Sequence, residues 1–342
     1  MNILIPSLQA PFVRGGADLM TAGLKHALAE SGHHVEIVFF PFNFSSVDHI
    51  AQLMDYCSTQ NFETVNGYLV DKLLVLQFPV YYVNHPDKTL WLMHQHRPAY
   101  DLYDPVCASK ALAALRKKIV EQDTRELKNL PAVYTMCRNI SHRLHRFNRI
   151  ASTPLYHPPA HEDRFYCDAP YDVIFFPSRL ETLKRQDLLV RAMAHTRSPV
   201  TAVIAGEGGG RQHLQALVRQ LNLSRKVCLA GHITEEEKYT LYARSLGVFF
   251  GPRDEDYGYI TLEAMLSSKP VITCTDSGGP LEFVTDGETG FVVEPDPERI
   301  AQKIDWLHAN KNKAKEMGQA GRQAYQEKNI NWNSVVDTLL HR

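Results

Sequence analysis

Two carboxylates, Glu255 and Glu263, stand eight residues apart in the second half of the chain. Gly258 lies between them, and Thr261 is placed to cap a short apolar helix that carries Glu263 in its first turn. Backbone N–H groups at a helix start attract anions such as a diphosphate, and carboxylates accept hydrogen bonds from sugar hydroxyls. The spacing therefore suits a site for a sugar diphosphate, although acidic residues around a first turn can simply stabilise the helix dipole.

Two cations occupy a comparable place earlier in the chain. Arg179 and Lys184 follow the apolar run 173–176, which we expect to be a buried strand. A planar guanidinium and a flexible ammonium can converge on one diphosphate. Solvated residues at a helix start would more often be acidic than basic because of the helix dipole, so a phosphate site is the favoured interpretation. Gly206 comes after the next apolar run, 200–205, and indicates a flexible turn.

A glycine pair marks the first loop of the chain. Gly15 and Gly16 stand between a strand expected at 2–6 and a helix expected at 17–31. They let a phosphate or a sugar approach the backbone, although a plain tight turn also uses such a pair. The G-x-G-x-x-G pattern of dinucleotide-binding proteins is missing, which removes the main support for a nicotinamide dehydrogenase.

Two histidines, His94 and His96, follow the apolar run 90–93 and share one face if the strand continues. A metal site would need a third ligand, and none has a recognisable spacing. Hydrogen bonding beside a sugar is the favoured role, with ordinary polar packing as the alternative. Asp254 and Asp256 could also hold a divalent cation, but the two cations described above can offset phosphate charge themselves, so we expect no metal.

Apolar runs alternate with helical patterns through both halves, which predicts two doubly wound parallel sheets of the α/β class. We expect a Rossmann-like N-terminal domain over 1–158, a Rossmann-like C-terminal domain over 159–328, and a last helix within 329–342 that packs back on the first domain. The polar, proline-bearing segment 157–163 marks the boundary. The expected strands are 2–6, 35–40, 73–78, 90–93, 131–135, 153–156, 173–176, 200–205, 227–229, 248–250, 271–273 and 291–293. The expected helices are 17–31, 108–127, 138–147, 181–194, 211–221, 235–244 and 260–266.

The composition is that of a soluble globular protein, because 44% of the 342 residues are hydrophobic and 22% are charged. A net charge of −1 gives no reason to expect nucleic acid as a partner. Six scattered cysteines without a Cys-x-x-Cys pair argue against a zinc site or a disulfide framework and fit a reducing cytosol. No run approaches the roughly 20 apolar residues of a membrane span, and the first residues read as a strand, so we expect a cytoplasmic protein.

The segment 110–149 is locally basic, with ten Lys and Arg residues against three acidic ones. Such a block can contact anionic lipid headgroups at the inner face of a membrane, or a phosphorylated acceptor. The solvated faces of two helices explain the same composition equally well.

These motifs together resemble the retaining GT-B glycosyltransferases of family 4. The resemblance rests on the two Rossmann-like domains, the Gly-Gly loop, Arg179 with Lys184, Gly-Glu-Gly at 206–208, and the E-x7-E pattern that ends at Glu263. The run 91–97 is similar to a bacterial branch of that family. The resemblance implies a GT-B fold whose two domains face a central cleft. It also implies a metal-independent hexosyltransferase that retains anomeric configuration and uses no resident cofactor.

The resemblance further implies roles for single residues. Arg179 and Lys184 would bind the donor diphosphate and stabilise the departing nucleotide. Glu263 would accept hydrogen bonds from the ribose, and Glu255 would hold hydroxyls of the transferred sugar. The side chain or carbonyl of His94 would approach the reacting sugar, which makes the catalytic set His94, Arg179, Lys184 and Glu255. The other donor-binding positions are Gly15, Gly16, Gly206, Gly258, Tyr259 and Ile260, and the acceptor side carries His96 and Arg97.

The implied donor is a nucleotide-diphosphate sugar with uridine or guanosine as its base. The implied acceptor is a glycan or a lipid-linked precursor of a surface polysaccharide. A GT-B nucleotide-sugar epimerase and a sugar phosphorylase are the alternatives among enzymes. A catalytically silent subunit that binds nucleotide sugar is the alternative from another class, and its mark would be loss of the charged set, which is present here.

Overall fold

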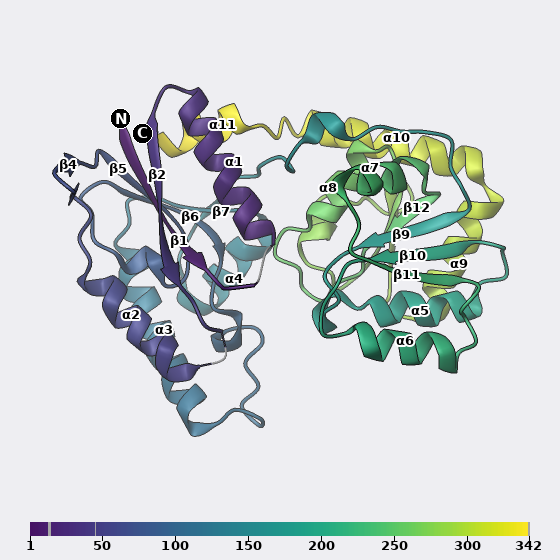
Figure 1. The fold of residues 1–342 in the computed structure, drawn as a ribbon, viewed down its shortest axis with the longest axis horizontal. Coiled ribbons are helices and arrows are strands. Elements are labelled where there is room, and N and C mark those ends of the chain that lie inside the picture. The colour runs from purple at the N-terminus through teal and green to yellow at the C-terminus, as the bar shows by residue number, and fades with distance from the viewer. Residues whose placement is uncertain (13–14, 45, 341–342) are drawn as a thin grey trace. The chain divides into compact units, whose positions relative to one another are not determined.

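The chain divides into two compact units in the computed structural model (Figure 1). Residues 1–160 and 331–342 form unit 1, and residues 161–330 form unit 2. The structure describes residues 1–12, 15–44 and 46–340. The last two residues of the segment 329–342, for which we predicted a helix, lie outside the described residues.

Within the described residues, unit 1 is built on a parallel sheet with strand order β2-β1-β5-β6-β7-β8. Its strands are β1 (Asn2–Gln9), β2 (His34–Pro41), β5 (Lys72–Gln77), β6 (Lys88–His94), β7 (Val133–Thr135) and β8 (Thr153–Pro154). Most residues of β5 and β6 are buried, as is typical of strands with helices on both faces. A short antiparallel hairpin of β3 (Thr64–Val65) and β4 (Tyr68–Leu69), which the sequence did not predict, lies outside this sheet.

The helices of unit 1 are α1 (Gly16–Glu30), α2 (Val47–Thr59), α3 (Lys110–Lys128), α4 (Arg138–Asn148) and α11 (Trp332–Leu340), with 3-10 turns η1 (Val80–Tyr82) and η2 (Arg97–Ala99). Helix α2 was not predicted from the sequence, although Ser46 caps it by accepting a hydrogen bond from the N–H of His49 at 3.1 Å. Trp332 at the start of α11 packs edge-on against Trp91, with 6.3 Å between ring centres. It also lies against Gly23, where any side chain would collide with its ring, so the C-terminal helix packs on unit 1.

Unit 2 also has a parallel sheet, with strand order β11-β10-β9-β12-β13-β14. Its strands are β9 (Val173–Pro177), β10 (Thr201–Ala205), β11 (Val227–Gly231), β12 (Gly247–Phe249), β13 (Val271–Cys274) and β14 (Gly290–Val293). The chain starts in the middle of the sheet at β9, winds to one edge, returns to β12 and winds to the other edge. This is the doubly wound order that the alternation of strands and helices predicted.

The helices of unit 2 are α5 (Gln186–His195), α6 (Arg211–Gln220), α7 (Glu235–Arg244), α8 (Tyr259–Leu266), α9 (Pro297–Ala309) and α10 (Lys311–Glu327). Three 3-10 turns, η3 (Glu162–Arg164), η4 (Thr182–Lys184) and η5 (Gly279–Glu282), lie before β9, between β9 and α5, and between β13 and β14. The helix predicted at 181–194 is wrong in its first turn, because η4 ends at Lys184 and α5 begins at Gln186, with Arg185 between them. Arg185 has a left-handed backbone (φ 55°), which cannot continue a right-handed helix.

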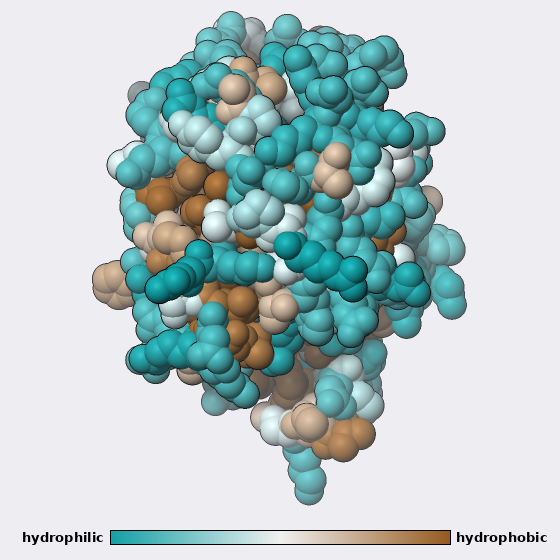
Figure 2. Space-filling view, turned by 90° about the vertical axis from the view of Figure 1, so that its right-hand side faces the viewer, coloured by the Kyte–Doolittle hydropathy of each residue, from teal (hydrophilic) through white to brown (hydrophobic). Residues whose placement is uncertain are grey.

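The side of the molecule that Figure 2 presents is mostly hydrophilic, with small hydrophobic patches among the polar side chains. Over the part of the chain that the structure describes, no helix combines the length and the apolar character needed to cross a membrane.

Candidate functional site

The predicted donor residues of unit 2 follow two neighbouring strands. Strands β9 and β12 pair with each other, and the chain turns away from this pair in opposite directions. In open parallel sheets, ligands bind outside the carboxyl ends of such a pair. Arg179 and Lys184 come after β9, whereas Glu255 and Gly258 come after β12. The strand order therefore brings both groups to the same edge of one sheet.

Lys184 and Glu255 are in direct contact, although they lie 71 residues apart in the sequence. The Nζ of Lys184 is 2.6 Å from Oε2 of Glu255, and the two side chains are only 19% and 20% exposed. The same Nζ lies 5.7 Å from the centre of the Phe250 ring, so an aromatic face also bounds the cation. The pair places a positive and a negative charge at one point, where phosphate and hydroxyl groups of one ligand could each find a partner.

Arg179 is held less firmly than Lys184. Its Nη1 lies 2.9 Å from Oε1 of Glu181, and both of these side chains are about half exposed. An ion pair with this exposure is weak, so a phosphate can replace Glu181 as the partner of the guanidinium. The backbone of Arg179 is fixed, because its carbonyl oxygen accepts a hydrogen bond from Nε2 of Gln186 at 2.7 Å.

The start of α8 differs from the prediction in its cap. Gly258, with a left-handed backbone (φ 89°), is the N-cap, and a Cβ at this position would come within 3.0 Å of Pro280. Thr261, predicted as the cap, is a buried residue inside the helix. Tyr259 and Ile260 are the first two helical residues, and the N–H groups of a first turn have no carbonyl partner within the helix. The predicted anion-binding amides are therefore at the helix start.

Glu263 begins the second turn of α8, one turn later than predicted, and its side chain is 14% exposed. The hydroxyl of Tyr242 donates to Oε2 of Glu263 at 2.6 Å, while Nζ of Lys238 is 3.7 Å from Oε1. Burial first, and next the charge of Glu263, raise the pKa of Tyr242, which therefore stays a hydroxyl donor. Tyr242 thus orients one oxygen of the carboxylate and leaves Oε1 able to accept hydrogen bonds from a ligand.

Gly206 has a role in backbone packing. Its φ is 134°, and a Cβ at this position would lie 2.0 Å from the carbonyl oxygen of Ser178 in the loop after β9. Its N–H donates to the carbonyl oxygen of Gly231 at 2.7 Å. The sequence predicted a flexible turn here, but the loop is packed tightly against its neighbours, which only glycine allows.

In unit 1, Gly15 and Gly16 follow β1 at the start of α1. Gly15 is the N-cap, and its N–H donates to Oδ2 of Asp18 at 2.8 Å. Strand β1 pairs with β2 on one side and with β5 on the other, and the winding of the chain reverses between β1 and β5. The two glycines therefore lie at the edge of this sheet where ligands bind in such folds.

His94 and His96 follow β6 in the same sheet and have different surroundings. His94 is half-buried, with Nδ1 3.1 Å from the carbonyl oxygen of Gln95. His96 is buried, and its ring packs on Phe78 with 5.1 Å between ring centres. Burial, and next the charge of His94, lower the pKa of His96 to about 4. His96 is therefore neutral at physiological pH and is the less accessible of the two.

Arg97 is fixed by an acidic neighbour in the turn that follows. Its Nε and Nη2 donate to Oδ2 of Asp101 at 2.9 and 2.6 Å, and Asp101 is itself 3.3 Å from Nε of the buried Arg143. Two guanidinium groups thus contact the carboxylate of Asp101.

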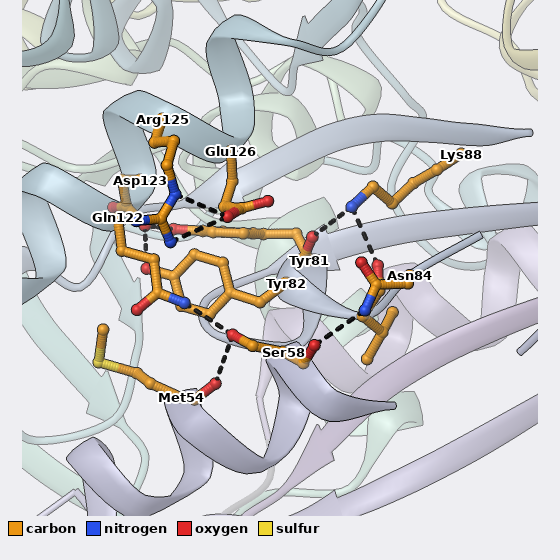
Figure 3. Close-up of polar contacts among 11 residues, drawn as sticks. Met54, Ser58, Tyr81, Tyr82, Asn84, Lys88, Gln122, Asp123, Arg125 and Glu126 are labelled. Carbon is orange, nitrogen blue, oxygen red and sulfur yellow. Dashed lines mark hydrogen bonds and ion pairs between the residues drawn. The ribbon is translucent and has the colours of Figure 1, made fainter. Parts of the chain in front are cut away.

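Tyr100 connects this loop to a buried carboxylate on α3. Asp123 is fully buried and accepts hydrogen bonds from the hydroxyls of Tyr81 at 2.8 Å, Tyr100 at 2.5 Å, and Tyr82. Figure 3 shows Tyr81 and Tyr82 beside Asp123. Burial raises the pKa of Asp123 to about 6, and the three hydroxyl hydrogen bonds oppose the rise. Three aromatic side chains from two turns therefore depend on one acceptor.

The same network reaches the residue between the two histidines. Nε2 of Gln95 donates to Oδ1 of Asn148 at 2.8 Å, and Nδ2 of Asn148 donates to Thr124 at 2.7 Å and approaches the Tyr100 hydroxyl at 3.4 Å. The loop that carries His94 and Arg97 is thus tied through buried polar groups to α3 and α4.

Across residues 1–12, 15–44 and 46–340, no three His, Cys, Asp or Glu side chains gather in the way that metal ligands do. The residues that sequence reasoning missed are the supporting ones. Arg185 directly follows Lys184, and its charge beside a predicted phosphate-binding residue was the signal that could have identified it. No feature of the sequence indicated a role for Tyr242. Asp123 gave a signal, because it is a charged residue on the inward side of a predicted helix.

Residues 167–324 match the family described as glycosyl transferases group 1. The matched residues lie within unit 2 and make up slightly less than half of the chain. The matched region contains the four charged residues of the predicted donor site, Arg179, Lys184, Glu255 and Glu263.

Two curated relatives carry the same name. The human alpha-1,3/1,6-mannosyltransferase ALG2 is 30% identical over 167 residues, which cover 44% of this chain and 40% of that protein. Its counterpart from Dictyostelium discoideum is 25% identical over 295 residues, which cover 75% of this chain and 68% of that protein. The match therefore spans less than half the length of the human relative.

Solved structures of low sequence identity share the fold. Sucrose-phosphate synthase from Thermosynechococcus elongatus has a TM-score of 0.78 at 18% identity, over 98% of this chain and 96% of that chain. Anabaena HepE, solved in complex with UDP-glucose, has a TM-score of 0.71 at 16% identity, over 99% and 98%. The prediction of two Rossmann-like, parallel-sheet domains of the GT-B type is confirmed.

Proposed function

We propose that the chain is a metal-independent, retaining hexosyltransferase that moves a sugar from a nucleotide-diphosphate sugar to a glycan or lipid-linked acceptor in surface polysaccharide synthesis. The observation that carries this proposal is the contact of Lys184 with Glu255 at the carboxyl ends of β9 and β12. An ammonium and a carboxylate at this point suit the diphosphate and the sugar of one donor molecule. The match of residues 167–324 with group 1 glycosyl transferases supports the same assignment.

The two cations of unit 2 act on the leaving group in this proposal. Negative charge grows on the diphosphate as the bond from its oxygen to C1 of the sugar breaks, and the charges of Lys184 and Arg179 stabilise it. Lys184 exchanges its carboxylate partner for phosphate, and Glu255 then accepts hydrogen bonds from hydroxyls of the transferred sugar. Glu263, oriented by Tyr242, accepts hydrogen bonds from the ribose.

The donor in this proposal is a UDP- or GDP-sugar. The UDP-glucose in the structure of the Anabaena relative supports a uridine nucleotide, and the name of the human relative supports the transfer of a hexosyl group. Gly15 and Gly16 lie at the binding edge of the unit 1 sheet, where a donor phosphate or sugar can approach their backbone.

The acceptor in this proposal is held by unit 1. His94 approaches the reacting sugar, and Arg97 and the neutral His96 contact the acceptor. A neutral imidazole can donate one hydrogen bond and accept another, as a sugar hydroxyl requires. The guanidinium of Arg97 has the planar geometry that suits an acceptor carrying phosphate.

We also propose that the enzyme works in the cytoplasm, with the basic segment 110–149 against an anionic inner membrane face. This segment forms α3 and α4, and some of its cations have acidic partners, as Lys118 has in Asp55 at 2.6 Å. Each Lys or Arg near an anionic surface contributes about 1 kcal/mol to membrane binding, so the cations outside such pairs would dominate the attraction.

A thermal-shift screen against nucleotides and nucleotide sugars tests the proposed function. A ligand at 100 times its Kd stabilises the state that binds it by about 2.7 kcal/mol, which raises the Tm by several degrees. We expect UDP- or GDP-sugars to raise the Tm and NAD to leave it unchanged. A stabilising sugar nucleotide is then incubated with lipid-linked glycan. Nucleoside diphosphate release that depends on this acceptor supports transfer, whereas an epimerised donor, a free sugar phosphate or binding without turnover supports the alternatives.

Removal of divalent cations is expected to leave transfer unchanged. The positive charge that stabilises the leaving diphosphate comes from Arg179 and Lys184 in the proposal, so a metal would be redundant. The measurement is the rate of nucleoside diphosphate release before and after incubation with EDTA, followed by repletion with Mg²⁺ or Mn²⁺. Loss of activity with EDTA and its recovery with metal would instead assign Asp254 and Asp256 to a cation.

A further inference from the structure

Arg185 occupies a backbone position that suits glycine better than arginine. Its φ of 55° and ψ of 44° lie in the left-handed region, which a Cβ disfavours. It is the N-cap of α5, but its side chain makes no capping hydrogen bond, and short polar side chains are preferred there. The local structure therefore gives no reason for an arginine at this position.

The contacts of the Arg185 guanidinium explain why an arginine occupies this position. Its Nε donates to the carbonyl oxygen of Gly251 at 2.7 Å, and Nη2 donates to that of Pro252 at 2.7 Å. Nη1 and Nη2 bind the two oxygens of Asp276 at 2.9 and 2.6 Å in a bidentate pair. The Arg185 side chain is 16% exposed and that of Asp276 is 44% exposed, so the two bonds to backbone carbonyls are better shielded from water than the pair with Asp276.

These partners belong to loops that follow different strands. Gly251 and Pro252 begin the loop after β12 that contains Glu255, whereas Asp276 lies in the loop after β13. Arg185 itself follows η4 in the loop after β9, and these three strands are neighbours in the sheet. One side chain thus joins three loops at the edge where the predicted donor residues lie.

Backbone hydrogen bonds join the same three loops. The N–H of Arg253 donates to the carbonyl oxygen of Leu183 at 2.8 Å, and the N–H of Glu255 donates to that of Ser277 at 2.8 Å. These bonds form only if the loops stay in register. Arg185 lies two residues after Leu183 and is bonded to the two residues just before Arg253, so its side chain is placed to keep that register.

The loops need a link that does not depend on the donor residues themselves. In the proposed function, Lys184 binds phosphate and Glu255 binds sugar, so their mutual ion pair cannot hold the loops while the donor is bound. The contacts of Arg185 with Gly251, Pro252 and Asp276 involve none of the proposed donor ligands. They can persist through the whole reaction.

We propose that Arg185 is a positioning residue that holds the Glu255 loop beside Lys184 while both bind the donor. This inference rests on the proposed function. Asp276 contributes to the same positioning, because its carboxylate binds the guanidinium of Arg185 in a planar, bidentate geometry. The left-handed backbone at Arg185 is retained because the side chain reaches all three partners from there.

Three variants test the role. Arg185→Gly removes the guanidinium and places the residue best suited to φ 55° in the backbone, so the turn itself should fold. Asp276→Ala removes the bidentate partner without any change near Lys184. Arg191→Ala is the matched control, because Arg191 lies on the same helix in an exposed pair with Asp187 at 3.9 Å.

The first measurement compares two ligands by calorimetry. In Arg185→Gly and Asp276→Ala we expect affinity for the nucleotide sugar to fall by about 10-fold or more, because misplacement of one binding group by about 1 Å has effects of this size or larger. Affinity for the nucleoside diphosphate should change less than about threefold, because Glu255 contacts only the sugar. The double variant should resemble Arg185→Gly, since the side chain of Asp276 acts only through the guanidinium. A merely structural role would lower both affinities together, and equal losses would overturn the inference.

The second measurement does not depend on the enzyme activity. Hydrogen exchange of the amides of residues 253–255 should quicken in Arg185→Gly and Asp276→Ala and stay unchanged in Arg191→Ala. Unchanged exchange in both test variants would overturn the inference. If the wild-type protein binds no nucleotide sugar, the proposed function fails, and faster exchange would still establish that Arg185 holds the loops. If the wild type binds the donor and the variants bind it equally well, the inference alone fails.

Discussion

Replacement of Lys184 with alanine is expected to lower kcat/KM for sugar transfer by about 10³-fold, the effect of removing one fixed group that stabilises charge in a transition state. The Lys184 ammonium lies 2.6 Å from Glu255 and is the more buried of the two proposed phosphate-binding cations. The loss should appear in kcat as well as KM, because the leaving diphosphate carries more charge in the transition state than in the bound donor. Nucleoside diphosphate release at varied donor concentration measures both.

The controls separate lost chemistry from lost structure. The Lys184 and Glu255 pair is partly exposed, so its removal should change the free energy of unfolding by only about 1 kcal/mol. Lys313→Ala, at an exposed position on α10, should keep the wild-type rate, and Lys184→Arg should recover part of the loss because the charge remains. A Lys184→Ala enzyme that works within about threefold of the wild type would contradict the assignment of Lys184 to the leaving group.

The two sheets could be predicted because their strands are short apolar runs between turn residues. Run 173–176 became β9 and run 271–273 became β13, with boundaries shifted by about one residue. Helix α2 was not predicted, although the sequence carries its signals. Ile50, Leu53, Met54 and Cys57 recur at the i, i+3, i+4, i+7 spacing of an amphipathic helix, and Ser46 is a favourable N-cap.

The composition of the donor site was predictable, and its contacts were not. The residue types and spacing of Arg179, Lys184 and Glu255 indicated phosphate and sugar chemistry from the sequence. Their meeting depends on the pairing of β9 with β12, and a one-dimensional pattern does not specify which parallel strands are neighbours. The link between Arg185 and Asp276 joins residues 91 apart for the same reason.

The sequence pattern also did not predict the backbone conformation of single residues. The periodic pattern of 181–194 predicted one helix, because apolar spacing records which side chains face the core and not the φ of a single residue. Arg185 and Gly258 both have left-handed backbones, and each separates a loop with a proposed donor ligand from a helix. A glycine suggests a left-handed backbone from the sequence alone, whereas an arginine gives no such indication.

Replacement of Asp123 with alanine is expected to lower the stability of unit 1 by about 4 kcal/mol. The change leaves the buried hydroxyls of Tyr81, Tyr82 and Tyr100 without their acceptor, and each such group costs about 1–3 kcal/mol. Denaturant unfolding followed by tryptophan fluorescence measures the loss, because two of the three tryptophans, Trp91 and Trp332, belong to unit 1 and only Trp306 belongs to unit 2.

Three further variants should change the stability of unit 1 by smaller amounts than Asp123→Ala. Tyr82→Phe removes one hydroxyl and keeps the carboxylate, so it should cost about 1 kcal/mol. Asp123→Asn keeps the volume and one strong acceptor oxygen, and we expect a loss between these two. Glu121→Gln, an exposed change on the same helix, should have almost no effect. If Asp123→Ala cost no more than Tyr82→Phe, the three hydroxyls would not depend on this carboxylate.

The pH dependence of this difference tests the charge on Asp123. Burial raises its pKa to about 6 in the folded protein, against about 3.9 in an unfolded chain, so the folded state binds the proton more tightly. The stability that Asp123 contributes is therefore greatest below about pH 4 and falls as the pH rises through about 6. Relative to Asp123→Asn, which cannot titrate, the wild type should lose up to about 3 kcal/mol between pH 4 and pH 7. A constant difference over this range would mean that Asp123 is already ionised at pH 4, with the hydrogen bonds from the three tyrosines outweighing its burial. The loop that carries His94 would then be linked, through Tyr100, to an ionised carboxylate over this whole pH range.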